Sequence, residues 1–276
     1  MLKTIRNAFK NSRERYRIPR RVQDVIPVNA VYKDGIFKTG NLYTKSWRFS
    51  DINYLVASRE DKETMLLKYS ELINSLDSGA MTKITLNNHQ EYREKLEESV
   101  TMPLKGDEGD RYRAEYNRVI IDKALGGSGL MQEKYITVSA PKRNVEEART
   151  YFARIGYELE QHFAALGSKC REMDALERLR VLHDFYRPGD ENNFFLDLND
   201  LMKKGHDFRD NICPDSIERN KDHLMLGNKY VRVFYLKDYA SYIKDSFVSE
   251  LTEIGKSMML SVDIIPIPTD VAVKEV

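Results

Sequence analysis

Cysteine and long uncharged apolar runs are scarce in this sequence. Only Cys170 and Cys213 occur among its 276 residues, too few for the disulfide framework of a small secreted domain. No window approaches the roughly 18 apolar residues that a membrane-spanning helix needs. The first residues also lack the apolar stretch of a secretory signal. We therefore expect a soluble protein of a reducing, cytoplasmic compartment.

The sequence also lacks the spaced motifs of catalytic and nucleotide sites. It contains no Gly-x-Ser-x-Gly elbow, no His-Glu-x-x-His helix and no Gly-x-Gly-x-x-Gly turn. A glycine cluster at residues 126–129 follows a predicted helix, whereas a phosphate-binding loop follows a strand and precedes a helix. We expect this cluster to end the helix and act as a hinge. No catalytic residue and no cofactor site is predicted for this segment.

Two groups of polar residues have the chemistry of metal ligands but not the spacing. Cys170, His183, His206 and Cys213 lack the short Cys and His pairs that zinc sites show. We expect Cys170 to be buried beside a strand and the two His-Asp pairs to make local hydrogen bonds. A metal-dependent enzyme built on these four residues is kept as an alternative. The acidic loop 107–110 lacks the ligand spacing of a calcium loop and is expected to be a solvated tip.

The net charge of +1 conceals a strong asymmetry. Residues 1–21 contain eight Lys and Arg against Glu14 alone, a net charge of +7, so the rest of the chain carries −6. Apolar residues at i, i+3 and i+7 predict a short basic amphipathic helix that binds an anionic membrane surface or a partner protein. A solvated, disordered arm is the alternative. The candidate membrane- or partner-binding residues are Leu2, Lys3, Ile5, Arg6, Phe9, Lys10, Arg13, Arg15, Arg17, Arg20 and Arg21.

Direct binding to DNA is a second use for a basic arm. Tyr239 and Tyr242, beside Lys237 and Lys244, are candidates for stacking on bases. The body of the protein is net acidic, however, which argues against nucleic acid binding outside the arm.

Helical and strand patterns alternate along the rest of the chain. The strands are predicted from period-two alternation, and the helices from apolar stripes that begin at the capping residues Ser58, Asn144 and Asp174. A mostly charged segment, residues 89–100, is predicted to be a surface helix. The predicted strands are residues 30–38 with a turn at Asp34-Gly35, 42–49, 82–88, 130–140, 168–173, 216–222, 229–236 and 258–264.

Residues 229–270 are the clearest unit, a strand, a helix and a second strand. In the second strand, Met258, Leu260, Val262 and Ile264 alternate with residues of the other face, which predicts one buried side. Residues 268–270 then look like the opening of another helix, which is too short to form alone. We therefore expect the sequence to be part of a longer protein.

Strand-helix-strand units with strand pairs between them predict an α+β fold. We expect mixed sheets made of split-βαβ (ferredoxin-like) units, with helices packed on one face and two lobes. Residues 1–22 are the basic arm. Residues 23–128 are a β-β-α-β lobe with extra helices, and residues 129–276 are a second α/β lobe.

A resemblance to a known family extends over nearly the whole chain from residue 18 onward. The segments that carry it are 18–27 (IPRRVQDVIP), 49–65, 69–88, 110–124, 132–139, 166–189, 202–216 and 236–270. They resemble the N-terminal region of the conjugation ATPases of type IV secretion systems, the TraE/TrbE/CagE-like VirB family. The similarity is greatest to the form found on conjugative transposons.

In that family a RecA-like half with Walker A and Walker B motifs follows this region, and neither motif occurs here. The resemblance therefore implies a non-catalytic N-terminal domain, with ATP and Mg²⁺ bound in a missing C-terminal half. It implies as partners the chain's own ATPase domain and inner-membrane proteins of the secretion channel. A second copy of the chain is a further candidate partner. The expected location is cytoplasmic, at the inner face of the cell membrane.

Overall fold

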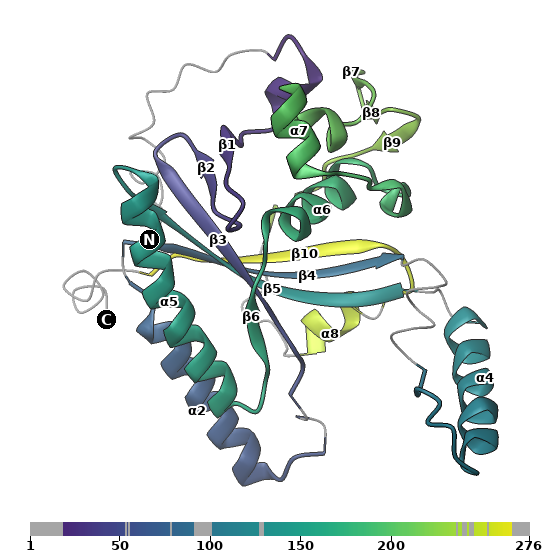
Figure 1. Ribbon diagram of the computed structural model, residues 1–276. Coiled ribbons are helices and arrows are strands. Elements are labelled where there is room, and N and C mark those ends of the chain that lie inside the picture. Colours follow the sequence, from purple (N-terminus) through teal and green to yellow (C-terminus); the bar gives the residue numbers. More distant parts are fainter. Residues whose placement is uncertain are drawn as a thin grey trace.

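Strands and helices in a β-α-β-β-α-β order form the centre of the computed structural model (Figure 1). The strands lie in the order β6-β3-β5-β4. Two split βαβ units interlocked in this way form a ferredoxin-like arrangement, which confirms the predicted α+β fold. The elements are β3 (Leu42–Phe49), α2 (Arg59–Ser75), β4 (Met81–Gln90), β5 (Leu130–Pro141), α5 (Val145–Ala165) and β6 (Cys170–Glu172). The structure describes residues 19–52, 54, 56–77, 79–90, 101–126, 130–235, 237–238, 242, 246–252 and 254–266.

The central sheet is extended at both sides. A hairpin of β1 (Ala30–Val31) and β2 (Phe37–Thr39) joins the first half of β3, and β6 pairs with the second half along the same edge. On the far side, β10 (Met258–Ile264) pairs with β4 over its whole length. All strand pairs among the described residues are antiparallel, so the prediction of mixed sheets is wrong for this part of the chain.

The predicted strand-helix-strand unit at residues 229–270 is divided between two sheets. Strand β9 belongs to a small sheet of order β7-β8-β9, whereas β10 belongs to the central sheet. The prediction of one local unit is therefore wrong, although both strands exist. The elements are β7 (Ile217–Arg219), β8 (Leu224–Leu226), β9 (Lys229–Val231) and α8 (Ser246–Thr252). The helix start predicted at residues 268–270 lies outside the described residues.

Helices α2 and α5 pack side by side on one face of the central sheet (Figure 1). The cap residues Ser58 and Asn144 accept hydrogen bonds from the third residue of each helix, as predicted. Every residue of the predicted α5 stripe is buried, and Phe152 packs against the fully buried Trp47 of β3. This face therefore holds the main apolar core.

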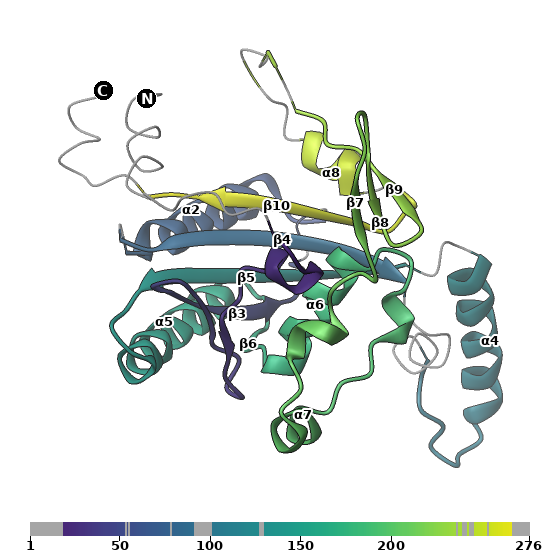
Figure 2. The same ribbon diagram turned by 90° about the horizontal axis from the view of Figure 1, so that it is seen from above.

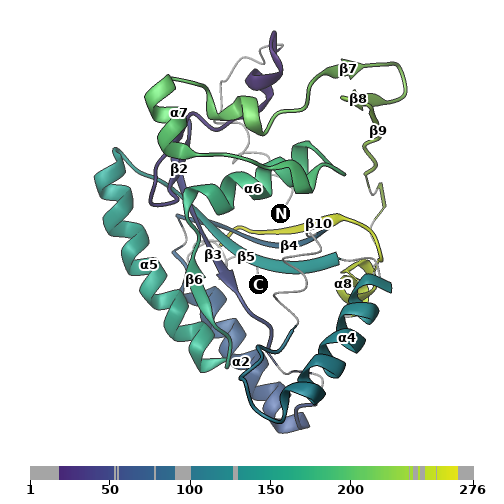
Figure 3. The same ribbon diagram turned by 45° about the vertical axis from the view of Figure 1, so that its right-hand side comes forward.

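Helix α6 (Ala175–Tyr186) lies against the opposite face (Figure 3). Its Ala175 and Leu179 form a second buried cluster with Phe37 of β2, Ile212 and Cys213. Because this cluster lies across the sheet from α2 and α5, the helices are not confined to one face as predicted. The remaining elements of this layer are η1 (Val22–Val25), η2 (Glu191–Asn193), α7 (Leu198–Lys204) and η3 (Phe208–Asn211).

The segment around the predicted lobe boundary differs from expectation. His89 and Gln90 continue strand β4, so the helix predicted for residues 89–100 does not start there, and residues 91–100 lie outside the described residues. Helix α4 (Asp110–Gly126) stands away from the sheet (Figures 1 and 2). Strand β5 begins directly beyond the predicted boundary yet pairs with β3 and β4, so both predicted lobes contribute to one sheet.

Candidate functional surfaces

The predicted basic arm lies mostly outside the described residues, since the structure describes only Arg20 and Arg21 of the candidate binding residues. Both are exposed. The amides of both residues donate to the Asp24 carboxylate, and the Arg21 guanidinium forms an ion pair with it at 3.2 Å. The Arg21 amide and guanidinium lower the pKa of Asp24. This contact holds the first described residues against the start of η1.

Residues 230–235, named here the aromatic tail, expose four large apolar side chains on either side of Arg232. The predicted strand 229–236 is paired only as far as Val231, where β9 ends. Tyr230, Val233, Phe234 and Tyr235 are 77%, 81%, 83% and 83% exposed. Successive side chains of an extended chain point to opposite sides, so neither side of the tail is covered by the described body.

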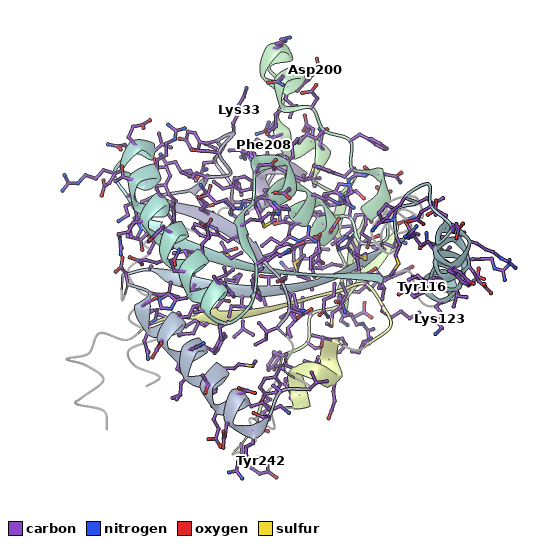
Figure 4. All side chains as sticks on the ribbon, turned by 60° about the horizontal axis from the view of Figure 1, so that its bottom comes forward. Lys33, Tyr116, Lys123, Asp200, Phe208 and Tyr242 are labelled. Carbon is purple, nitrogen blue, oxygen red and sulfur yellow. The ribbon has the colours of Figure 1, made fainter. Side chains whose placement is uncertain are left out.

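A second exposed apolar surface lies on α4. Tyr112, Tyr116 and Val119 are spaced by four and three residues, which places them on one face of the helix. All three are exposed, Tyr112 most of all. Figure 4 shows Tyr116 on α4 at one edge of the molecule and Tyr242 at another. The predicted base-stacking group is only partly described, because Tyr239 and Lys244 lie outside the described residues.

The acidic loop before α4 is held by Arg113. The guanidinium of Arg113 forms ion pairs with both Asp107 and Asp110. The Asp110 carboxylate also accepts the amides of Lys105 and Gly106. Arg113, with the amide of Gly109, lowers the pKa of Asp107. The amide of Lys105, with Arg113 and the amide of Gly106, lowers the pKa of Asp110. The carboxylates are therefore engaged within the loop rather than arranged around space for a cation.

The four residues of the metal-enzyme alternative lie in different surroundings. Cys170 packs against the core under α5, and Cys213 belongs to the buried cluster under α6. His206 is exposed, whereas His183 is buried against the ring of Phe194. Burial raises the pKa of both thiols. Within the described part of the chain, no three or more His, Cys, Asp and Glu side chains are grouped to hold a metal ion.

The two predicted His-Asp pairs behave differently. Asp207 accepts a hydrogen bond from the Arg209 amide, which is the local contact that was predicted. Asp184 instead accepts from Asn87 Nδ2 of β4 at 3.1 Å, so the prediction of a local contact is wrong there. His183 Nδ1 and Asp184 Oδ1 are buried and lie 3.9 Å apart, and neither atom has a hydrogen-bond partner among the described residues.

The hydrogen bond between Asn87 and Asp184 is part of a polar zone between α6 and the sheet, which the sequence did not lead us to expect. Asn87 and His89 are buried on β4, and Tyr135 is buried beside them on β5. Burial, followed by the charge of Glu133 to which its hydroxyl donates, raises the pKa of Tyr135 strongly. Polar residues alternate with other residues along β4 as far as His89, and this alternation indicates a strand with one polar face. We did not extend the strand to His89, because a charged helix was predicted to start there.

A groove of about 310 Å³ continues from this zone beneath α6. Its floor is the polar face of β3, β5, β4 and β10, where cross-strand hydroxyl pairs join Ser46 to Thr137 and Thr85 to Ser261. Its wall is the underside of α6 with Phe185 and Arg178. The groove therefore combines hydroxyl groups, apolar surface and positive charge.

Comparison with known proteins gives no further identification. No protein-family model matches the chain, and no curated protein matches it. In the described ranges, no helix has the length and apolar character needed to cross a bilayer.

Proposed function

We propose that the chain is the non-catalytic N-terminal docking domain of a conjugation ATPase of a type IV secretion system. The sequence resemblance to that family supports this proposal. The main structural support is the exposure of the large apolar side chains of the aromatic tail. In this proposal the domain positions the motor on inner-membrane proteins of the channel, and a later part of the parent protein hydrolyses ATP. Nucleotide turnover by the purified chain would contradict it.

The tail has the chemistry of a protein-docking segment. Exposed apolar patches of contiguous large side chains mark protein contacts more often than chance surface. Strand β9 is at the edge of its small sheet, so a partner can pair with its backbone while packing against the side chains that follow. The proposed partner is an inner-membrane channel protein that offers a strand edge and an apolar face.

The expected binding free energies favour attachment through both the aromatic tail and the basic arm. Burial of a large apolar side chain contributes about 1.5–3 kcal/mol, so the four in the tail offer roughly 6–12 kcal/mol. Association costs roughly 4–15 kcal/mol in lost freedom, so the tail alone binds weakly. Each basic residue of the arm near an anionic bilayer adds about 1 kcal/mol, screened beyond about 8 Å at physiological salt. The arm and the tail together then hold the domain at the membrane.

Site-specific photo-crosslinking in cells that assemble the channel tests the tail. A photoreactive phenylalanine analogue replaces Phe234, and the matched control places it at Tyr157, which is 66% exposed on α5. We expect position 234 alone to crosslink to an inner-membrane channel protein. Equal crosslinking at both positions, or none at position 234, would rule out the tail as the docking segment.

Liposome flotation tests the arm. We expect deletion of residues 1–21 to weaken binding to anionic vesicles, and a variant with the arm's Lys and Arg changed to Gln to bind as weakly. Neutral vesicles are the control, since they should bind all forms poorly. Equal flotation of the intact and shortened chains would contradict a membrane role. If arm-dependent, steeply salt-dependent DNA binding replaced vesicle binding, the DNA-binding alternative would take precedence.

A further inference from the structure

The groove under α6 has an unusual balance of charge. Lys83 and Arg178 line it, and none of the described residues that line it is Asp or Glu. Lys83 lies on β4, two strands away from Ser46 of β3, and forms a loose ion pair with the half-exposed Asp263 at 3.4 Å. Because Lys83 is paired with Asp263, the excess positive charge of the groove lies mainly at Arg178, and this charge suits an anion.

The guanidinium of Arg178 is held only by uncharged groups among the described residues. Its Nη1 donates to the carbonyl oxygens of Gly35 (2.6 Å) and Thr44 (2.7 Å), and its Nη2 donates to Thr44 Oγ1 (2.8 Å). The guanidinium also lies over the Phe37 ring, 4.0 Å from its centroid. Every one of these acceptors is uncharged, and no carboxylate of the described residues lies within ion-pair distance of Arg178.

A guanidinium has five N–H donors, of which these contacts use three. The remaining two, on Nε and Nη2, share one edge of the planar group, the edge that binds carboxylate or phosphate with two parallel hydrogen bonds. Burial lowers the pKa of Arg178, and an arginine nevertheless stays protonated at neutral pH. A partly buried positive charge without a counter-ion is costly, and a bound anion offsets that cost.

We propose that the groove binds a small organic anion, with its carboxylate or phosphate head on Arg178 and its apolar body against Phe185, Met173 and Met259. A volume of about 310 Å³ is at the small end of ligand sites, which range over roughly 300–1,000 Å³. The hydroxyl groups on the floor provide further donors to the head group. This site is independent of the docking proposal, because the aromatic tail is not part of it.

Methyl NMR of the intact chain with labelled methionines provides a local readout. Met173 and Met259 line the groove, whereas Met225 lies on β8 in the other sheet and serves as the control. We expect phenyl phosphate or benzoate to shift the Met173 and Met259 signals saturably and to leave Met225 unchanged. Benzyl alcohol, which has the ring without the charge, should bind at least tenfold more weakly. Saturable shifts with phenyl phosphate alone assign a phosphate head, and with benzoate alone a carboxylate head.

Four variants, one of them a control outside the groove, separate binding from folding. We expect Lys83→Met to weaken binding about threefold, and Lys105→Met, an exposed control outside the groove, to change nothing. We expect Arg178→Lys, which keeps a charge but loses the planar fork, to weaken binding at least tenfold. Because Arg178 also holds Gly35 and Thr44, Ser261→Trp provides a second test, blocking the groove from an exposed position on β10. Unchanged binding in Ser261→Trp, or no saturable shift in the unaltered chain, would overturn the proposal.

Discussion

Gly35 lies where the β1–β2 turn touches the segment that leads into α6. Its φ of +77° is in the left-handed region, and an added Cβ would lie 2.1 Å from the carbonyl oxygen of Met173. Gly40 also has a positive φ, +58°, but an added Cβ there would meet nothing within 4 Å. Substitutions at these two glycines therefore distinguish the cost of backbone strain, which both share, from the cost of a steric clash, which only Gly35 has.

We expect Gly35→Ala to destabilise the protein far more than Gly40→Ala. Strain alone costs about 1–2 kcal/mol, whereas Gly35→Ala adds an overpacking cost of about 1–3 kcal/mol or more against backbone that cannot rotate away. Urea unfolding monitored by the fluorescence of the single tryptophan, Trp47, measures both. Equal losses of unfolding free energy would mean that the turn does not pack against Met173 as described.

At the scale of single elements, α6 begins with contacts that the sequence could predict. Asp174 accepts the amide of Glu177, and the Glu177 carboxylate accepts the amide of Asp174, the reciprocal pair that defines a capping box. The Glu177 carboxylate also receives two hydrogen bonds from the guanidinium of Arg171 on β6. These contacts tie the last strand of the ferredoxin-like unit to the helix on the far face.

The Arg171–Glu177 pair predicts a pH dependence. Hydrogen bonding to Arg171 is the main cause of the lowered pKa of Glu177, so the pair stabilises the fold while the carboxylate is ionised. This contribution is fully present above the ordinary pKa of 4.5 and is lost as the pH falls through the lowered value. We expect Arg171→Met to cost about 0.5–1 kcal/mol at pH 7, the range of partly exposed pairs, and almost nothing at acidic pH below that value.

The control for this experiment is Arg59→Met. Arg59 and Glu63 form an i,i+4 pair in which both side chains are largely exposed, so its loss should hardly change stability at any pH. Unfolding free energies from urea titrations at several pH values measure both variants. A cost for Arg171→Met that stayed constant down to acidic pH would contradict an electrostatic origin.

Elements with purely local signals were predictable, and those that depend on a distant partner were not. Strand β3 has the predicted bounds, and α5 begins at its predicted cap, because alternation and capping act within a few residues. The run 232–236 has strong β propensity, but a strand also needs a neighbour, and pairing ends at Val231. The contact of Asn87 with Asp184 joins positions 97 residues apart, which no local pattern reveals.

The same limit applies to the whole molecule. The split-βαβ units could be predicted from the order of the elements. The position of β5 between β3 and β4 could not, because it places strands of both predicted lobes in one sheet, and a glycine-rich hinge was expected to separate those lobes. The groove under α6 depends on several such long-range pairings, because its floor combines β3, β5, β4 and β10 and its wall is α6. Its charge balance therefore emerges only once the sheet order is known.

Strand β10 shows how far the central sheet depends on distant chain. It pairs with β4 throughout its seven residues, and its Met258, Leu260 and Ile264 are half-buried. Asn88 of β4 also donates to the carbonyl oxygen of Thr252, just before this strand. Half-burial of three apolar side chains contributes about 3 kcal/mol in all. Without β10, the backbone edge of β4 would be open to pairing with another chain.

We therefore expect a variant that ends at residue 256 to unfold at lower urea concentration and to aggregate, whereas a variant that ends at residue 266 keeps β10 and behaves like the intact chain. Size-exclusion chromatography detects the association, and urea titration measures the loss of about 3 kcal/mol. A mutation that removes only apolar contact, Leu260→Ser, should lower stability without causing association, since the backbone edge stays covered. Equal urea midpoints for the two shortened chains would mean that the β4 edge is protected by something other than β10.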